Sequence, residues 1–176
     1  MIKTFGQNFL RLDYNLFALV SGRDEGQVLK IFYKGLSRLG DGHLYILFAL
    51  WEMLFNGYAG RMLVLVILLA FAMELPAYML IKKSVKRLRP FERYPKIPFF
   101  IKPPDQYSFP SGHTAAAFLM ARLISWQLPL LSFLLFVLAG LIGYSRVYLR
   151  VHYPSDVLFG LMLGLLAANL ALMIVF

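Results

Sequence analysis

The segment 145–156 reads SRVYLRVHYPSD and gathers residue types that can do chemistry at the junction of two long apolar stretches. Proline is favoured at the first position of a helix because its missing N–H would be unpaired there. We therefore expect a helix to begin near Pro154, with His152 just before it and Asp156 in its first turn. In that geometry the carboxylate can hold one nitrogen of the imidazole and leave the other free, which makes a histidine a base or a nucleophile.

The segment 109–118, FPSGHTAAAF, holds a second histidine. Pro110 to Gly112 predict a turn, and the small residues from Thr114 onward predict the start of a helix. The N-terminus of a helix offers free N–H groups and a partial positive charge to an anion, and Gly112 lets the backbone approach that anion closely. His113 is expected in the first turn, beside whatever is bound.

A third polar segment, 82–90, reads KKSVKRLRP and ends another apolar stretch. Glu74 lies eight residues before Lys82, so the two side chains point to roughly the same side of a helix. An unpaired carboxylate inside a membrane is costly, which makes Glu74 a candidate accessory residue of the site. The alternative is that Glu74 only satisfies a neighbouring helix.

Composition places the chain among integral membrane proteins. Hydrophobic residues make up 60% of the 176 residues, which is too apolar for a soluble globule. The stretches 126–144 and 157–176 carry no charge, and each is close to the roughly 20 residues that a transmembrane helix needs. We predict an all-α fold, a polytopic bundle of transmembrane helices in a single domain, 1–176. The five expected spans are about 41–57, 61–82, 111–127, 128–145 and 154–176.

Two segments of this domain are expected outside the spans. Residues 1–40 predict an interfacial N-terminal segment with an amphipathic helix near 5–20, because charged residues interrupt its apolar character. Residues 82–110 predict an active-site loop, since 91–109 hold four prolines and six aromatic residues and cannot form a long helix. A connection of this length is uncommon unless it is functional, and the alternative is a disordered linker.

Five spans would bring all three polar segments to one face of the membrane. The residues expected there are Lys82, Arg89, Ser111, Gly112, His113, Arg146, His152 and Asp156. Fixed cations, a hydroxyl and helix-end N–H groups match the charge that a phosphoryl group carries in its transition state. Of the two histidines, one can attack phosphorus and the other can protonate the leaving oxygen.

These segments resemble the three-part signature of the type 2 phosphatidic acid phosphatase superfamily. The parts are Lys, six residues, Arg-Pro at 82–90; PSGH at 110–113; and Ser-Arg, five residues, His, three residues, Asp at 145–156. All three match in order, without a gap or a substitution. The short chain with an N-terminal interfacial helix is also similar to the compact bacterial lipid phosphatases.

The resemblance implies an enzyme, a membrane lipid phosphatase that hydrolyses a phosphate monoester or a pyrophosphate through a phosphohistidine. His152 would be the nucleophile, Asp156 would orient it, and His113 would be the general acid for the leaving group. The residues that would hold the phosphate are Lys82, Arg89, Ser111, Gly112 and Arg146. No metal or other cofactor is implied, and the sequence offers no cluster of carboxylates to bind a metal.

The implied partners are a phosphorylated lipid and the bilayer. In so apolar a chain, the net charge of +9 fits anionic headgroups better than nucleic acid. The family suggests phosphatidic acid, phosphatidylglycerol phosphate, undecaprenyl pyrophosphate or lipid A phosphate as the substrate, and no residue chooses among them.

Three other functions are compatible with parts of this pattern. A phosphotransferase would use the same site and pass the phosphoryl group to a second lipid. A non-catalytic binder or transporter of anionic lipids would not require both histidines and the Asp156 carboxylate. The site is also similar to that of the soluble vanadium haloperoxidases, but the five predicted spans argue against a soluble enzyme.

The chain is expected to be a multi-pass protein of the bacterial inner (plasma) membrane. Most relatives of this kind act on the outer side, and we expect the active site at the extracytoplasmic face. The charges indicate the opposite, because only Arg61 and Arg122 of the 18 Lys and Arg residues fall outside the active-site face. The absence of cysteine excludes disulfides and thiolate metal sites.

Overall fold

The computed structural model describes residues 2–21, 26–103 and 105–176, and the regular elements among them are all helices. They are α1 (Ile2–Ser21), α2 (Gln27–Leu39), α3 (His43–Phe55), α4 (Gly57–Val85), α5 (Pro90–Arg93), α6 (Gly112–Gln127), the short 3₁₀ helix η1 (Pro129–Leu131), α7 (Ser132–Tyr148) and α8 (Pro154–Val175). The all-α prediction is confirmed. Residues 1 and 22–25 of the expected N-terminal segment, and residue 104 of the expected loop, lie outside the described residues.

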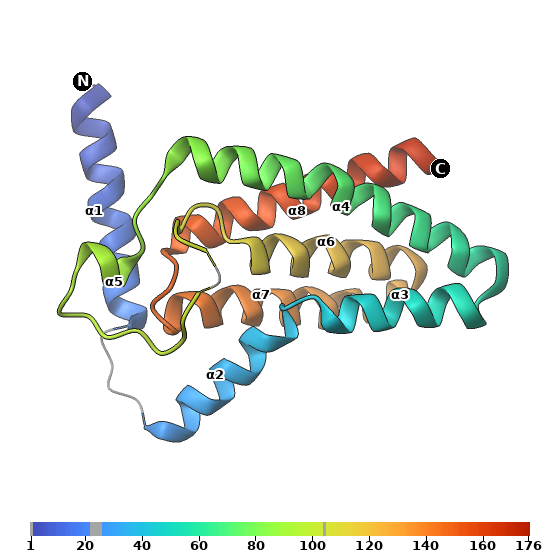
Figure 1. Cartoon of the computed structure of the whole chain (residues 1–176), viewed down its shortest axis with the longest axis horizontal. Helices are drawn as coiled ribbons and strands as arrows, with labels where there is room; N and C mark the ends of the chain where they lie inside the picture. The colour runs from blue at the N-terminus through green and yellow to red at the C-terminus, as the bar shows by residue number, and fades with distance from the viewer. Residues whose placement is uncertain (1, 22–25, 104) are drawn as a thin grey trace.

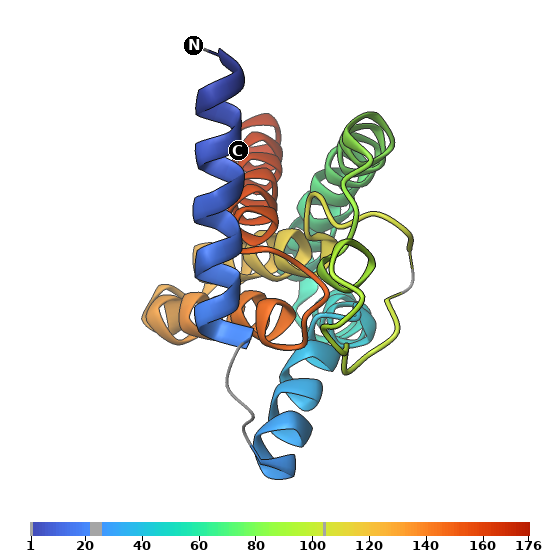
Figure 2. The ribbon, with the colours of Figure 1, turned by 90° about the vertical axis from the view of Figure 1, so that its left-hand side faces the viewer.

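The helices α3, α4, α6, α7 and α8 run side by side along the long axis of the molecule, and α1 crosses one end of them (Figure 1). Seen along that axis, α6 lies between α4, α7 and α8, and it packs against all three (Figure 2). The end of α4, the start of α6 and the junction of α7 with α8 lie at the same end as α1 (Figure 1).

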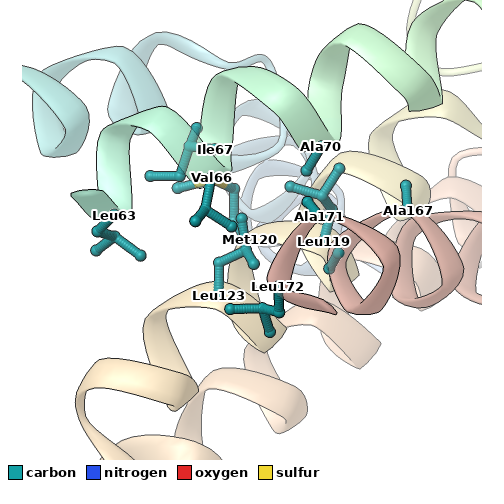
Figure 3. Packing of buried hydrophobic residues seen from close by; sticks show 11 residues of the cluster. Leu63, Val66, Ile67, Ala70, Leu119, Met120, Leu123, Ala167, Ala171 and Leu172 are labelled. Carbon is teal, nitrogen blue, oxygen red and sulfur yellow. The ribbon is translucent and has the colours of Figure 1, made fainter. Parts of the chain in front are cut away.

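A cluster of buried apolar side chains joins α4, α6 and α8 (Figure 3). Its members are Leu63, Val66, Ile67, Ala70, Leu119, Met120, Leu123, Ala167, Ala168, Ala171 and Leu172. Large apolar side chains also cover the outer surface, where Phe133 and Met173 are 83% and 79% exposed. Within lipid, helices associate through close packing of small residues, and an apolar outer surface is what such helices present to the bilayer.

Two glycines of α8 bring this helix against the start of α6. A Cβ atom at Gly160 would lie 2.4 Å from the carbonyl oxygen of Ser111, and one at Gly164 would lie 2.1 Å from that of Ala115. Only a residue without a Cβ atom fits at these two positions. The contact places the N-terminus of α6 beside the first turn of α8, and so brings two of the signature segments together.

Among the described residues, three helical stretches are long and apolar enough to cross a membrane, Gly57–Arg93, Pro129–Tyr148 and Pro154–Val175. They correspond to the predicted spans 61–82, 128–145 and 154–176. The predicted spans 41–57 and 111–127 correspond to α3, with 13 residues, and α6, with 16 residues. At a rise of 1.5 Å per residue these two helices are roughly 20 Å and 24 Å long, shorter than the roughly 30 Å of bilayer hydrocarbon. The predicted count of five spans is therefore not confirmed.

The helix α1 has the orientation expected of an interfacial helix, since it crosses the end of the bundle (Figure 1). It is also packed into the protein: Phe17 is fully buried, with its ring centroid 5.5 Å from that of Tyr153. Asp13 of the same helix is only 3% exposed. The N-terminal helix thus contributes a buried charge to the end of the bundle where the polar segments meet.

Among its described residues, the stretch 91–109, predicted to lack a long helix, contains only the end of the four-residue helix α5. This part of the prediction is confirmed. The connection is fixed to the end of the bundle, because the N–H of Ser108 donates to the carbonyl oxygen of Arg87 at 2.8 Å and that of Phe100 donates to the carbonyl oxygen of Leu149 at 3.4 Å. Its described part therefore folds against α4 and the α7–α8 junction.

Candidate active site

Hydrogen bonds tie the polar segments together at the α1 end of the bundle. Arg89 donates from Nη1 to the carbonyl oxygen of Val151 at 2.7 Å, which links the connection after α4 to the α7–α8 junction. Ser111, the residue before α6, donates its N–H to the carbonyl oxygen of Asp156 at 2.9 Å. Segments that are far apart in the sequence therefore meet at one place.

His152 lies just before α8, which begins at Pro154 and carries Asp156 in its first turn, as predicted. The N–H of Tyr153 donates to Oδ2 of Asp156 at 2.8 Å and fixes this carboxylate. The same oxygen lies 3.5 Å from Nδ1 of His152, and Nη1 of Arg89 lies 3.5 Å from Nε2. The imidazole thus faces a carboxylate on one side and a guanidinium on the other, at distances too long for short hydrogen bonds.

Burial lowers the pKa of His152 well below its usual value, and the positive charges of Arg89, Arg146 and Lys82 act in the same direction. The side chain is 2% exposed, so water screens these charges little. The imidazole is therefore neutral at neutral pH and keeps a lone pair for attack.

Two residues outside the predicted set hold Asp156 in place. Arg87 donates from Nη1 to Oδ1 of Asp156 at 2.7 Å, and its other terminal nitrogen pairs with Asp13 of α1. Asp13 in turn accepts from the N–H of Ser155 at 2.9 Å and from its hydroxyl at 2.6 Å. Arg87 therefore pairs with two buried carboxylates and fastens α1 to the start of α8.

The predicted phosphate-binding cations Lys82 and Arg89 both contact Asp105, which was not predicted. Lys82 Nζ lies 2.7 Å from Oδ2, the Tyr78 hydroxyl donates to the same oxygen at 2.7 Å, and Arg89 pairs with Oδ1. Burial opposes ionisation of this carboxyl, but the bonds from Lys82 and Tyr78 outweigh it and lower the pKa of Asp105 to about 2. An ionised carboxylate therefore bridges the two cations.

The start of α6 carries Ser111, Gly112 and His113 in the order predicted. The hydroxyls of Ser111 and Thr114 lie 2.9 Å apart, and both side chains are fully buried. A Cβ atom at Gly112 would lie 3.0 Å from the ring of Tyr78, so glycine permits the close approach of α4 to this turn. His113 follows in the first turn, with its Nε2 2.8 Å from Oδ1 of Asp41.

Arg146, near the end of α7, is 2% exposed and bonds to the Ser37 hydroxyl of α2. Its Nε has no hydrogen-bond partner among the described residues. A buried guanidinium with a free donor is suited to holding an anion.

A cavity of about 610 Å³ lies beside these residues, and Asp105, His113 and Arg146 are among those that line it. Glu74 lines it from α4, as do the apolar side chains of Phe71 and Leu75. The predicted residues Lys82, Arg89, Ser111, His152 and Asp156 are buried and do not line it. The structure thus brings all the predicted residues to one end of the bundle but opens only some of them to the cavity.

Comparison with known proteins identifies the family. The model of the PAP2 superfamily matches residues 42–176, so the chain belongs to the PAP2 superfamily, and the resemblance drawn from the three signature segments is confirmed. Decaprenylphosphoryl-5-phosphoribose phosphatase of Mycobacterium tuberculosis is 45% identical over 89 residues, which are 48% of this chain and 46% of that protein. The match thus spans about half the length of this curated relative.

Two solved structures share the fold. LpxE of Aquifex aeolicus matches with a TM-score of 0.79 and 31% identity, over 92% of this chain and 95% of that one. The transmembrane PAP2-type phosphatidylglycerolphosphate phosphatase of Bacillus subtilis matches with a TM-score of 0.76 and 24% identity, over 95% of this chain and 86% of that one. The three apolar helices among the described residues are long and apolar enough to cross a membrane, which indicates an integral membrane protein.

Proposed function

We propose that this protein is a lipid phosphatase that hydrolyses a phosphate monoester or a diphosphate through a phosphohistidine on His152, without a metal. The observation that carries the proposal is the orientation of His152. Its Nδ1 faces the Asp156 carboxylate and its Nε2 faces the guanidinium of Arg89. The nitrogen that can attack therefore points toward the cations that would hold the phosphate.

The reaction is a double displacement. Nε2 of His152 forms a bond to phosphorus as the bond from phosphorus to the lipid oxygen breaks, and His113 gives its proton to that oxygen. Asp156 stabilises the positive charge that develops on the His152 ring. In the second step His113 takes a proton from water, whose oxygen attacks phosphorus and releases phosphate and free His152.

The phosphoryl oxygens would be held by Lys82, Arg89 and Arg146, with the Ser111 hydroxyl and the N–H groups at the start of α6. Asp105 already pairs with the first two of these cations. A phosphate that binds them must displace this carboxylate, because two anions cannot share the same donors without repulsion.

The cavity supports a lipid as the substrate. Phe71 and Leu75 contribute apolar side chains to its wall, and Leu75 is 47% exposed on the outer surface of α4. An acyl or prenyl chain in the bilayer could therefore reach the cavity from the side. The relatives named above act on a decaprenyl-linked phosphoribose and on phosphatidylglycerolphosphate, which are a polyprenyl and a glycerol lipid.

The direct test is a panel of lipid phosphates presented to the purified protein, with a chelator present. The panel contains phosphatidic acid, phosphatidylglycerol phosphate, undecaprenyl pyrophosphate and lipid A phosphate. We expect release of inorganic phosphate from at least one of them, undiminished by the chelator. His152→Ala and His113→Ala, if folded, should release almost none.

The same assay separates the alternatives. A labelled donor lipid supplied with a second lipid would yield a labelled acceptor if the protein were a phosphotransferase. A protein that binds lipid phosphates without releasing phosphate from any donor or labelling any acceptor would be a non-catalytic binder.

A further inference from the structure

A second imidazole–carboxylate pair is formed by His113, the proposed general acid, and Asp41. His113 Nε2 is 2.8 Å from Oδ1 of Asp41, a residue outside the three signature segments. Asp41 lies 72 positions earlier in the chain, in the turn that joins α2 to α3. Each of the two proposed catalytic histidines therefore has a carboxylate of its own.

The turn that carries Asp41 is shaped to approach the imidazole. A Cβ atom at Gly40 would lie 3.3 Å from Cδ2 of His113 and 3.0 Å from Cγ2 of Ile142, so a larger residue would push the turn away from α6 and α7. Gly42, on the other side of Asp41, adopts φ 93°, which is in the left-handed region that favours glycine. The N–H of Asp41 donates to the carbonyl oxygen of Arg38 at 3.1 Å and fixes the turn.

We propose that Asp41 is a positioning residue for proton transfer to the leaving group, which rests on the function proposed above. By accepting from Nε2–H of His113, the carboxylate sets the orientation of the ring and directs Nδ1–H toward the leaving oxygen. It also stabilises the charged imidazolium that must be present before the proton is given away. Asp156 acts on the histidine that attacks phosphorus, and Asp41 acts on the histidine that protonates the leaving oxygen.

The alternative explanation is that Asp41 and His113 form a surface ion pair that has no part in the reaction. The Asp41 side chain is 39% exposed and that of His113 is 18% exposed, and exposed pairs add little to stability. The two explanations differ in one respect. In the first step, a positioning residue for the general acid matters only when the leaving group needs a proton, whereas a structural residue matters for every substrate.

The experiment compares two forms of one lipid from the panel that the wild-type protein hydrolyses. One form has the natural bridging oxygen, and the other has sulfur in its place. A thiolate departs without a proton, so the sulfur form bypasses the general acid. The rate at which the lipid leaving group is released in the first turnover is measured on both forms for Asp41→Asn, Asp41→Ala, His113→Ala and Asp156→Asn, because kcat would also include the attack of water that His113 assists. Thermal unfolding in detergent identifies the variants that are folded.

We expect Asp41→Asn to lower the first-turnover rate on the oxygen lipid by at least about tenfold and to leave that rate on the sulfur lipid within about twofold of the wild type. His113→Ala should show the same pattern in a more severe form. Asp156→Asn, the matched carboxylate on the attacking side, should be slow on both forms.

Two results would overturn the inference. If Asp41→Asn and Asp41→Ala slow both forms equally, or slow neither, Asp41 does not position the general acid, although rescue of His113→Ala by sulfur would still support the proposed function. If sulfur fails to rescue His113→Ala, the role of His113 as the general acid is wrong, and the role of Asp41 falls with it.

Discussion

His152 is the residue on which the proposed chemistry depends, and its surroundings determine its charge. It lies between the Asp156 carboxylate and the Arg89 guanidinium, and its side chain is 2% exposed. Burial and the neighbouring cations lower its pKa, so the folded protein resists protonation at this position. The same surroundings leave the ring neutral at neutral pH, as the proposed attack on phosphorus requires.

A titration tests this directly. The chain has three histidines, so the ring signals of ¹⁵N-histidine can be assigned by single substitutions. We expect the His152 ring to remain neutral well below pH 6.5, the usual value for a histidine. Below that pH the unfolded chain binds a proton that the folded chain excludes, so the free energy of unfolding should fall as the pH is lowered. A His152 ring that becomes charged at or above pH 6.5 would contradict the assignment.

In the proposed mechanism, Asp105 competes for Lys82 and Arg89 with any phosphate that binds these two cations. With a pKa of about 2 it stays ionised over the whole range in which the enzyme would work. Asp105→Asn removes this negative charge and keeps the shape of the side chain. We expect inorganic phosphate to inhibit this variant at concentrations at least about tenfold lower than it inhibits the wild type, because charge repulsion is lost.

The control for this prediction is Glu92→Gln, in the same connection between α4 and α6. Glu92 accepts from the N–H of Arg89 at 3.0 Å but does not pair with the guanidinium among the contacts of the described residues. The inhibition constant should change little there. Weaker inhibition of Asp105→Asn by phosphate would show instead that Asp105 holds the cations in position.

At the scale of the elements, the contact of α6 with α8 positions the site. Gly164→Ala would place a Cβ atom 2.1 Å from the carbonyl oxygen of Ala115 and force the two helices apart. We expect a loss of about 1–3 kcal/mol in the free energy of unfolding, together with a loss of activity, because Ser111 would move away from Asp156. Thermal unfolding in detergent and phosphate release measure the two effects.

Gly140→Ala is the matched control for this substitution. Gly140 lies in α7, and a Cβ atom there would meet nothing within 4 Å. Stability should be unchanged or slightly higher, since alanine favours a helix more than glycine does. Equal effects of the two substitutions would mean that the α6–α8 contact does not position the site.

Sequence patterns were sufficient for the residues that follow local rules. Pro154 marks the start of α8, and the small residues after Gly112 mark the start of α6. The signature residues were found because their spacing is fixed within short segments. The predicted bounds 41–57 and 111–127 agree with α3 and α6 to within two residues at each end, but both helices are short for a span.

The supporting residues could not be found in this way, because their partners are remote in the sequence. Arg87 lies 69 positions from Asp156, and Asp13 lies 142 positions from Ser155. The available signal for Asp13 was its charge within an apolar helix. For Asp41 and Asp105 no local pattern exists, and only the folded chain shows what they contact.

At the scale of the whole molecule, the site lies at one end of a bundle whose other end carries the α3–α4 turn (Figure 1). We propose five passes, with α3 and α6 as short spans, and the site at the extracytoplasmic face. The charge count opposes this orientation. The count of positive charges overstates the charge on this face, because Arg87 is neutralised within the protein by Asp13 and Asp156, and Arg89 by Asp105.

Labelling of single cysteines decides the orientation, since the natural chain has none. Lys96→Cys lies in the exposed part of the connection after α5, and Tyr58→Cys lies at the start of α4, where the natural side chain is 73% exposed. We expect an impermeant thiol reagent to label Lys96→Cys and to spare Tyr58→Cys in intact cells, and to label both after lysis. The opposite pattern in intact cells would place the site in the cytoplasm.

The central claim is that phosphorus becomes bonded to one nitrogen of His152 during turnover. A rapid-quench experiment with a lipid whose phosphate is ³²P-labelled measures this most directly. The account predicts a transient labelled protein that is stable to base and labile to acid, with the label on the peptide that contains His152, and no labelled protein in folded His152→Ala. Turnover by folded His152→Ala at the wild-type rate, or a label on any other residue, would contradict it.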